Sequence, residues 1–238
     1  MTAVAGLFTT TPYGRFGSDK WGPTVPIRLG WVLMEAPAVL VFAWIYPQGS
    51  QALEPGPLFF AGIWALHYGN RALAFPLLMR ARPGSRMSAS VFASGWLVTS
   101  LHAWLYATWL SELGTHLTSA WWTDPRFVVG LPLYGLGLGL ILHSEHLLRQ
   151  LRANRKPDDP PYVIPRRGAF QWVSSPHYLG EIVAWTGLMT ATWCPGGLFV
   201  WSITLANLIP RARATHRWYR ETFPEYPSER RALFPGVW

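Results

Sequence analysis

Runs of about 20 apolar residues recur along the sequence and are separated by short polar connections. A helix of this length crosses the ~30 Å hydrocarbon core of a bilayer, because each helical residue rises about 1.5 Å. We predict one helix over each of six runs, at 29–47, 57–79, 87–110, 127–148, 178–194 and 196–212. The last two runs meet at "CPGG", residues 194–197, where glycine and proline predict a tight turn.

The composition agrees with a membrane protein rather than a soluble one. Hydrophobic residues make up 50% of the 238 residues and charged residues only 13%, with 15 Trp. Residues 1–28 lack the basic start and long apolar run of a signal peptide. We therefore predict an all-α integral membrane protein, a single domain over 1–238. It has six transmembrane helices, or seven if part of residues 1–28 inserts.

The distribution of positive charge predicts the orientation of these helices. Of the 20 Lys and Arg, 18 lie in four segments, at 15–28, 80–86, 149–167 and 211–231. The alternate connections, at 48–56, 111–125 and 194–197, contain none. This pattern predicts cytoplasmic termini and a polar cavity open to the cytoplasm. The net charge of +8 also suits anionic membrane lipids, whereas no basic-aromatic motif supports binding to nucleic acid.

Cysteine and histidine give little support for a metal site. The single Cys194 excludes an intrachain disulfide and a cysteine-based metal cluster. His143 and His146 flank Glu145 closely, which is a weak metal signal, and we predict no metal. The glycine-rich stretch "YGLGLGL", residues 134–140, has the wrong spacing for a dinucleotide fingerprint. Its Gly135 and Gly139 are instead expected to let two helices approach closely.

Ionisable residues inside the apolar runs are the strongest functional signal, because a charge at that depth is costly. The first run contains Glu35, whose partner must come from another helix because residues 31–39 are otherwise apolar. The second run contains Tyr68 and Arg71, at the i, i+3 spacing that places both on one broad helix face. Tyr68 could alternatively be an interfacial tyrosine.

Two further carboxylates lie in the later runs. Glu145 and Arg149, at i, i+4, share a face with Arg152, and they could alternatively form an ordinary helix-end ion pair. Glu181 lies in the fifth run, where it could simply pair with a neighbouring arginine. An arginine-rich cavity of this kind suits either a phosphorylated cofactor or an anionic lipid.

An ordered set of short motifs resembles the steroid 5α-reductases, or 3-oxo-5α-steroid 4-dehydrogenases. The resemblance covers the chain from about Tyr13 to the C-terminus. The motifs are "YGRF" at 13–16, "LMEAP" at 33–37, "HYGNR" at 67–71, "RARP" at 80–83, "HSEHLLRQLR" at 143–152, "YVIPRRGAFQWVSSPHYLGE" at 162–181, "HRWYRETFPEYP" at 216–227 and the closing "RRALFP".

The resemblance implies that NADPH reduces the carbon–carbon double bond of a 4-ene-3-oxo steroid, such as testosterone or progesterone. Glu35 and Tyr68 match the family positions that hold the substrate carbonyl, so they are the expected catalytic residues. Hydride transfer to carbon 5 places negative charge on the carbonyl oxygen, which a hydrogen-bond donor in a dry site stabilises. Tyr68 can donate its phenolic proton, and Glu35 can donate if an apolar site keeps it protonated.

The resemblance also implies which residues bind NADPH. A cytoplasmic loop, 149–175, and a C-terminal segment, 211–238, are expected over the cofactor, together with the loop that follows the tyrosine helix. The expected cofactor residues are Arg71, Arg80, Arg82, Glu145, Arg149, Arg152, Tyr162, His177, Glu181, Arg211, Tyr219 and Arg230. Arginines suit the phosphates, carboxylates suit ribose or carboxamide groups, and aromatic side chains flank rings.

Three other functions remain open at this point. The protein could reduce another enone or enoyl lipid, such as an enoyl thioester, a polyprenal or a sterol. It could be a membrane methyltransferase that uses S-adenosylmethionine, or a non-catalytic lipid-binding or transport protein. We expect a monomer, located in the inner membrane if the source is bacterial and in the endoplasmic reticulum if it is eukaryotic.

Overall fold

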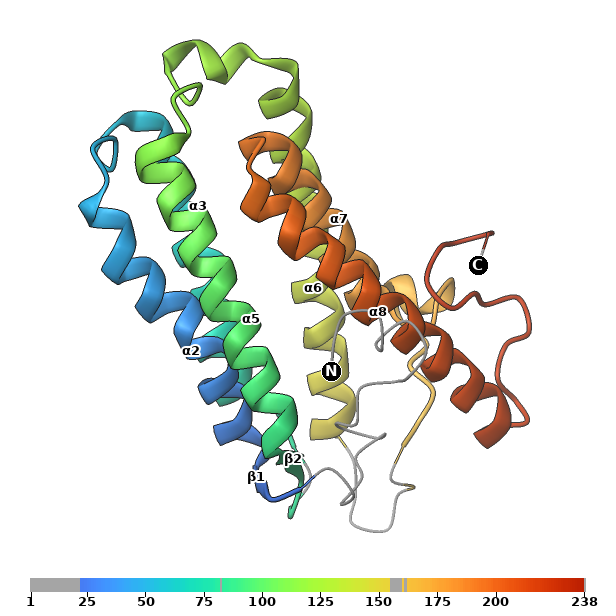
Figure 1. The fold of residues 1–238 in the computed structure, drawn as a ribbon. Helices are drawn as coiled ribbons and strands as arrows, with labels where there is room; N and C mark the ends of the chain where they lie inside the picture. Colours follow the sequence, from blue (N-terminus) through green and yellow to red (C-terminus); the bar gives the residue numbers. More distant parts are fainter. Residues whose placement is uncertain (1–21, 82, 155–159, 161, 238) are drawn as a thin grey trace. The chain divides into compact units, whose positions relative to one another are not determined.

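The structure, a computed structural model, describes residues 22–81, 83–154, 160 and 162–237. Over these residues the chain is mostly helical, which confirms the predicted all-α class (Figure 1). It forms two compact units. Thr11–Leu131 and Leu188–Val200, where described, form the N-terminal unit, and the described residues of Pro132–Gly187 and Trp201–Trp238 form the C-terminal unit.

The helices follow the apolar runs closely. In chain order, the elements up to the middle of the chain are β1 (Thr24–Pro26), α2 (Ile27–Ile45), η3 (Tyr46–Gln48), α3 (Pro55–Tyr68), η4 (Gly69–Ala74), α4 (Phe75–Leu78), β2 (Arg86–Ser88), α5 (Ala89–Thr108), η5 (Trp109–Leu113) and η6 (Ser119–Thr123). The later elements are α6 (Pro125–Ala153), η7 (Gly168–Gln171), α7 (Pro176–Thr192) and α8 (Pro195–Thr222). Only Trp193 and Cys194 join α7 to α8, so the connection is as short as predicted but lies one residue earlier, and Pro195, Gly196 and Gly197 already belong to α8.

Two differences from the predicted elements have simple physical causes. Strands β1 and β2 pair antiparallel, with Val25 opposite Met87, and three residues are too few for a recognisable alternation of apolar and polar positions. Helix α8 continues ten residues beyond the predicted end at 212, to Thr222. Hydropathy marks where an apolar run ends, whereas backbone hydrogen bonding continues into the polar sequence that follows.

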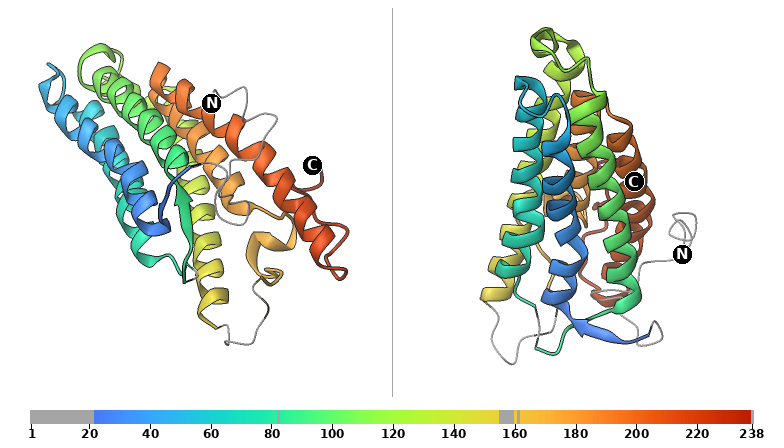
Figure 2. Two further views of the ribbon diagram at one scale, coloured as in Figure 1. Left: turned by 60° about the horizontal axis from the view of Figure 1, so that its bottom comes forward. Right: turned by 60° about the vertical axis from the view of Figure 1, so that its left-hand side comes forward.

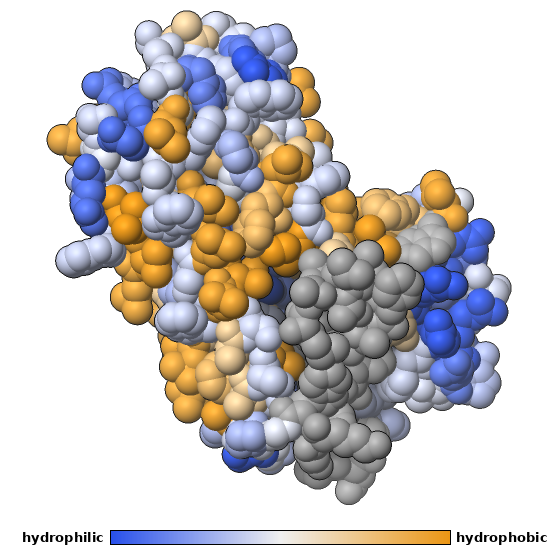
Figure 3. All heavy atoms as spheres, in the orientation of Figure 1, coloured by the Kyte–Doolittle hydropathy of each residue, from blue (hydrophilic) through white to orange (hydrophobic). Residues whose placement is uncertain are grey.

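Within the part of the chain that the structure describes, two helices are long and apolar enough to cross a membrane, Ile27–Gln48 and Pro125–Ala153. Many large apolar side chains of the N-terminal unit are exposed, including Leu40, Trp44 and Leu97, which are 68%, 75% and 65% exposed. Figure 3 shows hydrophobic residues gathered on the side of α2 and α5. Water-soluble monomers rarely expose so large an apolar area, so this surface suits lipid.

In the N-terminal unit, α2 packs against both α3 and α5, and both views of Figure 2 show these three helices side by side. Thr99 of α5 donates its hydroxyl to the carbonyl of Met34 on α2, at 2.8 Å. The indole of Trp64 on α3 donates to the carbonyl of Ala38 on α2, also at 2.8 Å. These side-chain-to-backbone hydrogen bonds fix the register of the three helices inside an apolar environment.

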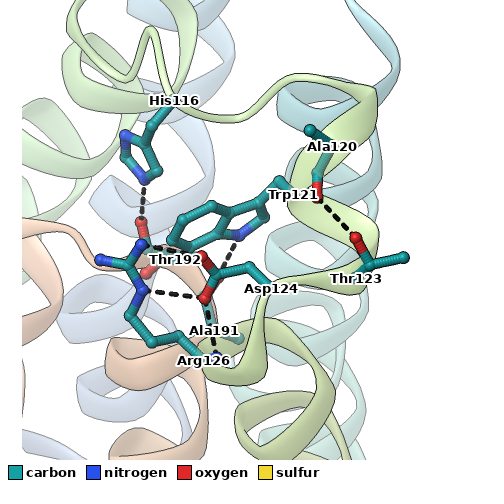
Figure 4. Close-up of polar contacts among 8 residues, drawn as sticks. All are labelled: His116, Ala120, Trp121, Thr123, Asp124, Arg126, Ala191 and Thr192. Atoms are coloured by element: carbon teal, nitrogen blue, oxygen red, sulfur yellow. Dashed lines mark hydrogen bonds and ion pairs between the residues drawn. The ribbon is translucent and has the colours of Figure 1, made fainter.

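The connection between α5 and α6 is fastened to the last turn of α7 (Figure 4). The indole of Trp121 donates to the carbonyl of Ala191 at 2.8 Å. Arg126 forms a bidentate pair with Asp124, at 2.9 and 2.8 Å, and its guanidinium lies 4.4 Å from the centre of the Trp121 ring. The hydrogen bond from Arg126 lowers the pKa of the Asp124 carboxyl to about 2. Arg126, one of two basic residues outside the four basic segments, is therefore neutralised locally.

In the C-terminal unit, α6 and α7 approach each other through glycine. A Cβ atom at Gly137 would overlap the backbone of Gly180 and Ala184, so only glycine fits there. The prediction that Gly135 and Gly139 make this approach is wrong, because a Cβ at either position meets open space. The glycines alternate along this stretch, and helical periodicity alone did not say which of them faces α7.

The chain after α8 returns to the start of α7. Val173 and Arg231 form a parallel bridge, in which the Ser174 amide donates to the Arg231 carbonyl at 2.9 Å. Leu233 is fully buried in a cluster with Ile182 of α7 and Leu208 of α8. The closing "RRALFP" is thereby held in place by both backbone pairing and apolar packing.

Candidate functional site

Glu35 is a buried carboxylate in the N-terminal unit that pairs with the partly buried Arg71. The residue is 5% exposed, and its Oε1 lies 3.1 Å from Nε of Arg71. The prediction that its partner comes from another helix is confirmed, because Glu35 lies on α2 and Arg71 on η4. The Arg71 guanidinium also lies 4.9 Å from the centre of the Trp31 ring and 5.7 Å from that of Phe75. Aromatic faces and a carboxylate together compensate the partly buried positive charge of Arg71.

A π-helical turn, η4, begins directly after Tyr68 and contains Arg71. Each residue of a π-helix turns the chain by less than a residue of an α-helix, which changes the direction of every later side chain. Arg71 bonds to Glu35 on α2, whereas Tyr68 contacts α5. The i, i+3 spacing did not predict this divergence. Gly69 and Asn70, both weak helix formers, are the sequence signal that could have suggested an irregular turn here.

Tyr68 is buried in an aromatic surrounding. It is 4% exposed, and its hydroxyl oxygen lies 3.0 Å from Nδ1 of His102 on α5. The Trp64 ring lies 4.5 Å from the Tyr68 ring and 4.8 Å from the His102 ring. Sequence reasoning missed His102, although a histidine within "SLHAWLY", residues 100–106, is an ionisable group in an apolar run.

The loop after α4 is the predicted basic loop. Arg80 is exposed, and Arg82 lies outside the described residues. The carbonyl of the preceding Met79 accepts a hydrogen bond from Nη2 of Arg28, at 3.0 Å. The backbone just before Arg80 is therefore held by the hydrogen bond from Arg28, while Arg80 itself is exposed.

In the C-terminal unit, the end of α6 carries the predicted acidic and basic residues. Glu145, 8% exposed, forms an i, i+4 ion pair with Arg149, whose Nη1 lies 3.6 Å from Oε2. The helix-end ion pair considered for these two residues is therefore present. Arg152, one turn further along, is exposed. Along the face predicted from their spacing, Glu145 is buried, Arg149 is half-buried and Arg152 is exposed.

The start of α7 meets the middle of α8 through a tyrosine and an arginine. Arg211 of α8 is 5% exposed, and its Nε donates to the Tyr178 hydroxyl at 2.8 Å. The Tyr178 ring lies 4.1 Å from the ring of His177, which is half-buried. Glu181, 8% exposed, lies one turn after His177 on α7. Tyr178 was not among the predicted residues, although it lies between two of them.

The C-terminal segment adds an aromatic stack with a buried arginine. The rings of Tyr219 and Tyr226 stack 5.2 Å apart at 11°, and the Arg230 guanidinium lies 5.2 Å from the Tyr226 ring centre. Arg230 is 4% exposed, and its Nε and Nη1 have no hydrogen-bond partner among the described residues. Tyr162 packs edge-on against Trp218 of α8, with ring centres 4.9 Å apart.

A hydrogen-bond network supports this stack. The Ser174 hydroxyl lies 2.7 Å from both Nδ1 of His216 and the Tyr226 hydroxyl. Burial lowers the pKa of His216, and the nearby charges of Arg220 and Arg231 lower it further. His216 is therefore neutral at pH 7 and can share a proton with Ser174. Sequence reasoning missed Ser174, His216 and Tyr226, because a polar network gives no periodic signal.

The C-terminal unit fits a phosphorylated dinucleotide in its chemistry. Buried guanidinium N–H groups without acceptors are costly, so the Arg230 side chain is set up to receive an anion. Buried carboxylates offer acceptors for hydroxyl and amide groups. Among the described residues, no group of three or more His, Cys, Asp or Glu is placed to hold a metal ion.

These features define an all-α protein with apolar helices that bury ionisable side chains, arranged in one polar cluster in each unit. The sequence profile of a family described as 3-oxo-5-alpha-steroid 4-dehydrogenase matches residues 85–238. The chain is 34% identical over 242 residues to steroid 5-alpha-reductase DET2 of Arabidopsis thaliana, covering all of this chain and 91% of that protein. It is 33% identical over 238 residues to 3-oxo-5-alpha-steroid 4-dehydrogenase 1 of Rattus norvegicus, covering 99% and 90%.

A similar match extends to 3-oxo-5-alpha-steroid 4-dehydrogenase 1 of Mus musculus, at 35% identity over 236 residues, covering 98% of this chain and 90% of that protein. The chain belongs to the 3-oxo-5-alpha-steroid 4-dehydrogenase family, a family of oxidoreductases. The resemblance inferred from the sequence motifs is thereby confirmed.

Proposed function

We propose that the protein reduces the carbon–carbon double bond of 4-ene-3-oxo steroids with NADPH, giving 5α-dihydro-3-oxo steroids. Relatives along the full length are named as steroid 5-alpha-reductases. In this chain, the observation that supports the proposal concerns Glu35 and Tyr68. Both are buried in the same unit, and each contacts a polar side chain of a neighbouring helix.

In the proposed mechanism these residues act on the substrate carbonyl. NADPH, when bound, supplies the hydride to carbon 5 of the steroid. Negative charge then develops on the 3-oxo oxygen as an enolate, and the Tyr68 hydroxyl donates to that oxygen. Carbon 4 takes a proton from water, which returns the enolate to a ketone and gives the saturated product. A donor aimed at developing charge in a dry site is worth about 10²–10³ in rate.

Glu35 acts on the same substrate oxygen as Tyr68 while it is hydrogen-bonded to Arg71. A carboxylic acid has a carbonyl oxygen that accepts and a hydroxyl that donates. Oε1 accepts from Arg71, and a proton on Oε2 is donated to the substrate oxygen.

The cofactor residues act through charge and shape. Arg149, Arg152, Arg211 and Arg230 of the C-terminal unit would hold the phosphates, and Arg80 and Arg82 are further proposed cofactor residues. Arg71 is retained by Glu35, with which it pairs. Glu145 and Glu181 would accept from ribose or carboxamide groups, and Tyr162, His177 and Tyr219 would flank the rings. Bidentate guanidinium contacts suit a pyrophosphate and a 2′-phosphate.

The proposed setting is a single monomeric membrane domain with six transmembrane helices, both termini in the cytoplasm, and a cofactor cavity on that side. Two sufficiently apolar helices and the lipid-suited surface of the N-terminal unit support it. The membrane is the inner membrane in a bacterium or the endoplasmic reticulum in a eukaryote. Membership of a dehydrogenase family disfavours the methyltransferase alternative, whereas another enone or enoyl lipid remains the second candidate substrate.

Replacement of Tyr68 by Phe tests the proposed role directly. We expect Tyr68→Phe to reduce turnover of progesterone about 10²–10³-fold, because it removes one donor to the oxyanion. NADPH affinity should stay within about threefold of wild type, a difference of less than 1 kcal/mol. Tyr46→Phe is the matched control, since it also removes a buried hydroxyl hydrogen bond, to the Ala52 carbonyl at 2.7 Å. Equal losses of turnover in the two variants, or equal loss of binding and turnover in Tyr68→Phe, would refute the role.

A further inference from the structure

We infer that His102 is a positioning residue for Tyr68: its Nδ1–H donates to the phenolic oxygen and directs the Tyr68 hydrogen toward the substrate carbonyl. The inference rests on the proposed function. It concerns a residue that neither the sequence motifs nor the comparisons single out. His102 is 1% exposed on α5, and its Nδ1 lies 3.0 Å from the Tyr68 hydroxyl oxygen.

The contact allows two tautomers with opposite consequences. If Nδ1 carries no hydrogen, Tyr68 donates to it, and the phenolic proton is held by the imidazole. If Nδ1 carries the hydrogen, the imidazole donates, and the phenolic proton can be given to another acceptor. Only the second tautomer lets Tyr68 act as a donor to the substrate. It also stabilises negative charge on the phenolic oxygen, which strengthens the hydrogen bond that the phenol donates onward.

The packing around His102 fixes the imidazole in its contact with Tyr68. The Trp64 ring lies edge-on at 4.8 Å and 61°, and the Tyr106 ring lies at 5.7 Å and 73°. Trp64 is itself held by its hydrogen bond to the Ala38 carbonyl and by stacking on Phe42, with ring centres 4.7 Å apart. Side chains held by close packing and hydrogen bonds keep a catalytic group in productive geometry.

Two variants separate positioning from packing. His102→Asn places an amide N–H where Nδ1–H lies, whereas His102→Leu fills similar space without a donor. We expect His102→Leu to lower kcat for progesterone about 10- to 100-fold, less than the loss of a direct donor. Its KM and its NADPH affinity should stay within about threefold. His102→Asn should recover kcat to within about threefold of wild type.

A double variant completes the test, with the folded fraction of each protein checked by thermal unfolding in detergent. If His102 acts through Tyr68, then adding His102→Leu to Tyr68→Phe should cause no further loss of kcat. Equal kcat losses in His102→Asn and His102→Leu, or additive losses in the double variant, would overturn the inference. A normal kcat for His102→Leu, with Tyr68→Phe impaired, would overturn it and leave the proposed function standing. Absence of turnover by the wild-type protein would overturn both.

Discussion

At the scale of single residues, Glu35 and Tyr68 each contact a polar side chain on a neighbouring helical segment, Arg71 and His102 respectively. Glu35 and Tyr68 were identifiable because ionisable groups are rare in apolar runs. Their contacts with Arg71 and His102 depend on how α2, α3 and α5 pack and on the π-helical turn η4 that follows Tyr68 and contains Arg71. Spacing along a regular helix contains none of that information.

The Glu35–Arg71 pair should be sensitive to mutation, because its carboxylate is buried while its guanidinium is partly exposed. We expect Arg71→Leu to lower the free energy of unfolding by about 3–5 kcal/mol, because it leaves a carboxylate buried without its countercharge. Glu35→Gln added to Arg71→Leu should restore part of this loss. Thermal unfolding of the four proteins in detergent measures the coupling. Additive losses would show that the pair does not interact, and Asp124→Asn at the more exposed pair is the control, with a much smaller effect.

At the scale of elements, the positions of the helices were largely predictable and their contacts were not. Each apolar run became a helix, because burial in lipid or protein leaves the backbone no partner but itself. The pairing of β1 with β2 and the extension of α8 had no hydropathy signal. The alternating glycines of α6 show the same limit, since all three fit a helix but only Gly137 lies against α7.

Alanine substitutions in α6 test this contact. Gly137→Ala should destabilise the protein by about 1–3 kcal/mol, because the new methyl group would overlap backbone atoms that cannot move aside. Gly135→Ala should leave stability unchanged or raise it by up to about 1 kcal/mol, since alanine favours the helix and its methyl group meets open space. Midpoints of thermal unfolding in detergent measure both. A larger loss at Gly135 than at Gly137 would contradict the described packing of α6 on α7.

At the scale of the whole molecule, the charge pattern predicts how the helices are oriented in the membrane. Introduced cysteines can test this orientation, because the sequence has a single native cysteine, Cys194. Cys194 is buried, and burial raises the pKa of its thiol to about 12, so it should not react. Ser50 and Ser228 are exposed and lie in segments predicted on opposite sides of the membrane. Cysteine is a conservative replacement for serine at both positions.

Labelling of these two variants in sealed membranes measures the orientation. We expect a membrane-impermeant maleimide applied to the extracytoplasmic side to modify Ser50→Cys at once. Ser228→Cys should react only after permeabilisation, because the basic C-terminal segment is retained in the cytoplasm. The reverse order of labelling would invert the predicted topology. Equal labelling without permeabilisation would place both segments on the same side.

The measurement that tests the central claim most directly is turnover by the detergent-purified wild-type protein with NADPH and progesterone or testosterone. The account predicts consumption of NADPH and, by mass spectrometry, a product heavier by two hydrogens. That product should retain the 3-oxo group and carry a saturated bond at carbons 4 and 5 in the 5α configuration. Folded protein that binds NADPH but leaves both steroids unchanged would contradict the steroid assignment. Folded protein that binds no NADPH would contradict the proposed reductase activity itself.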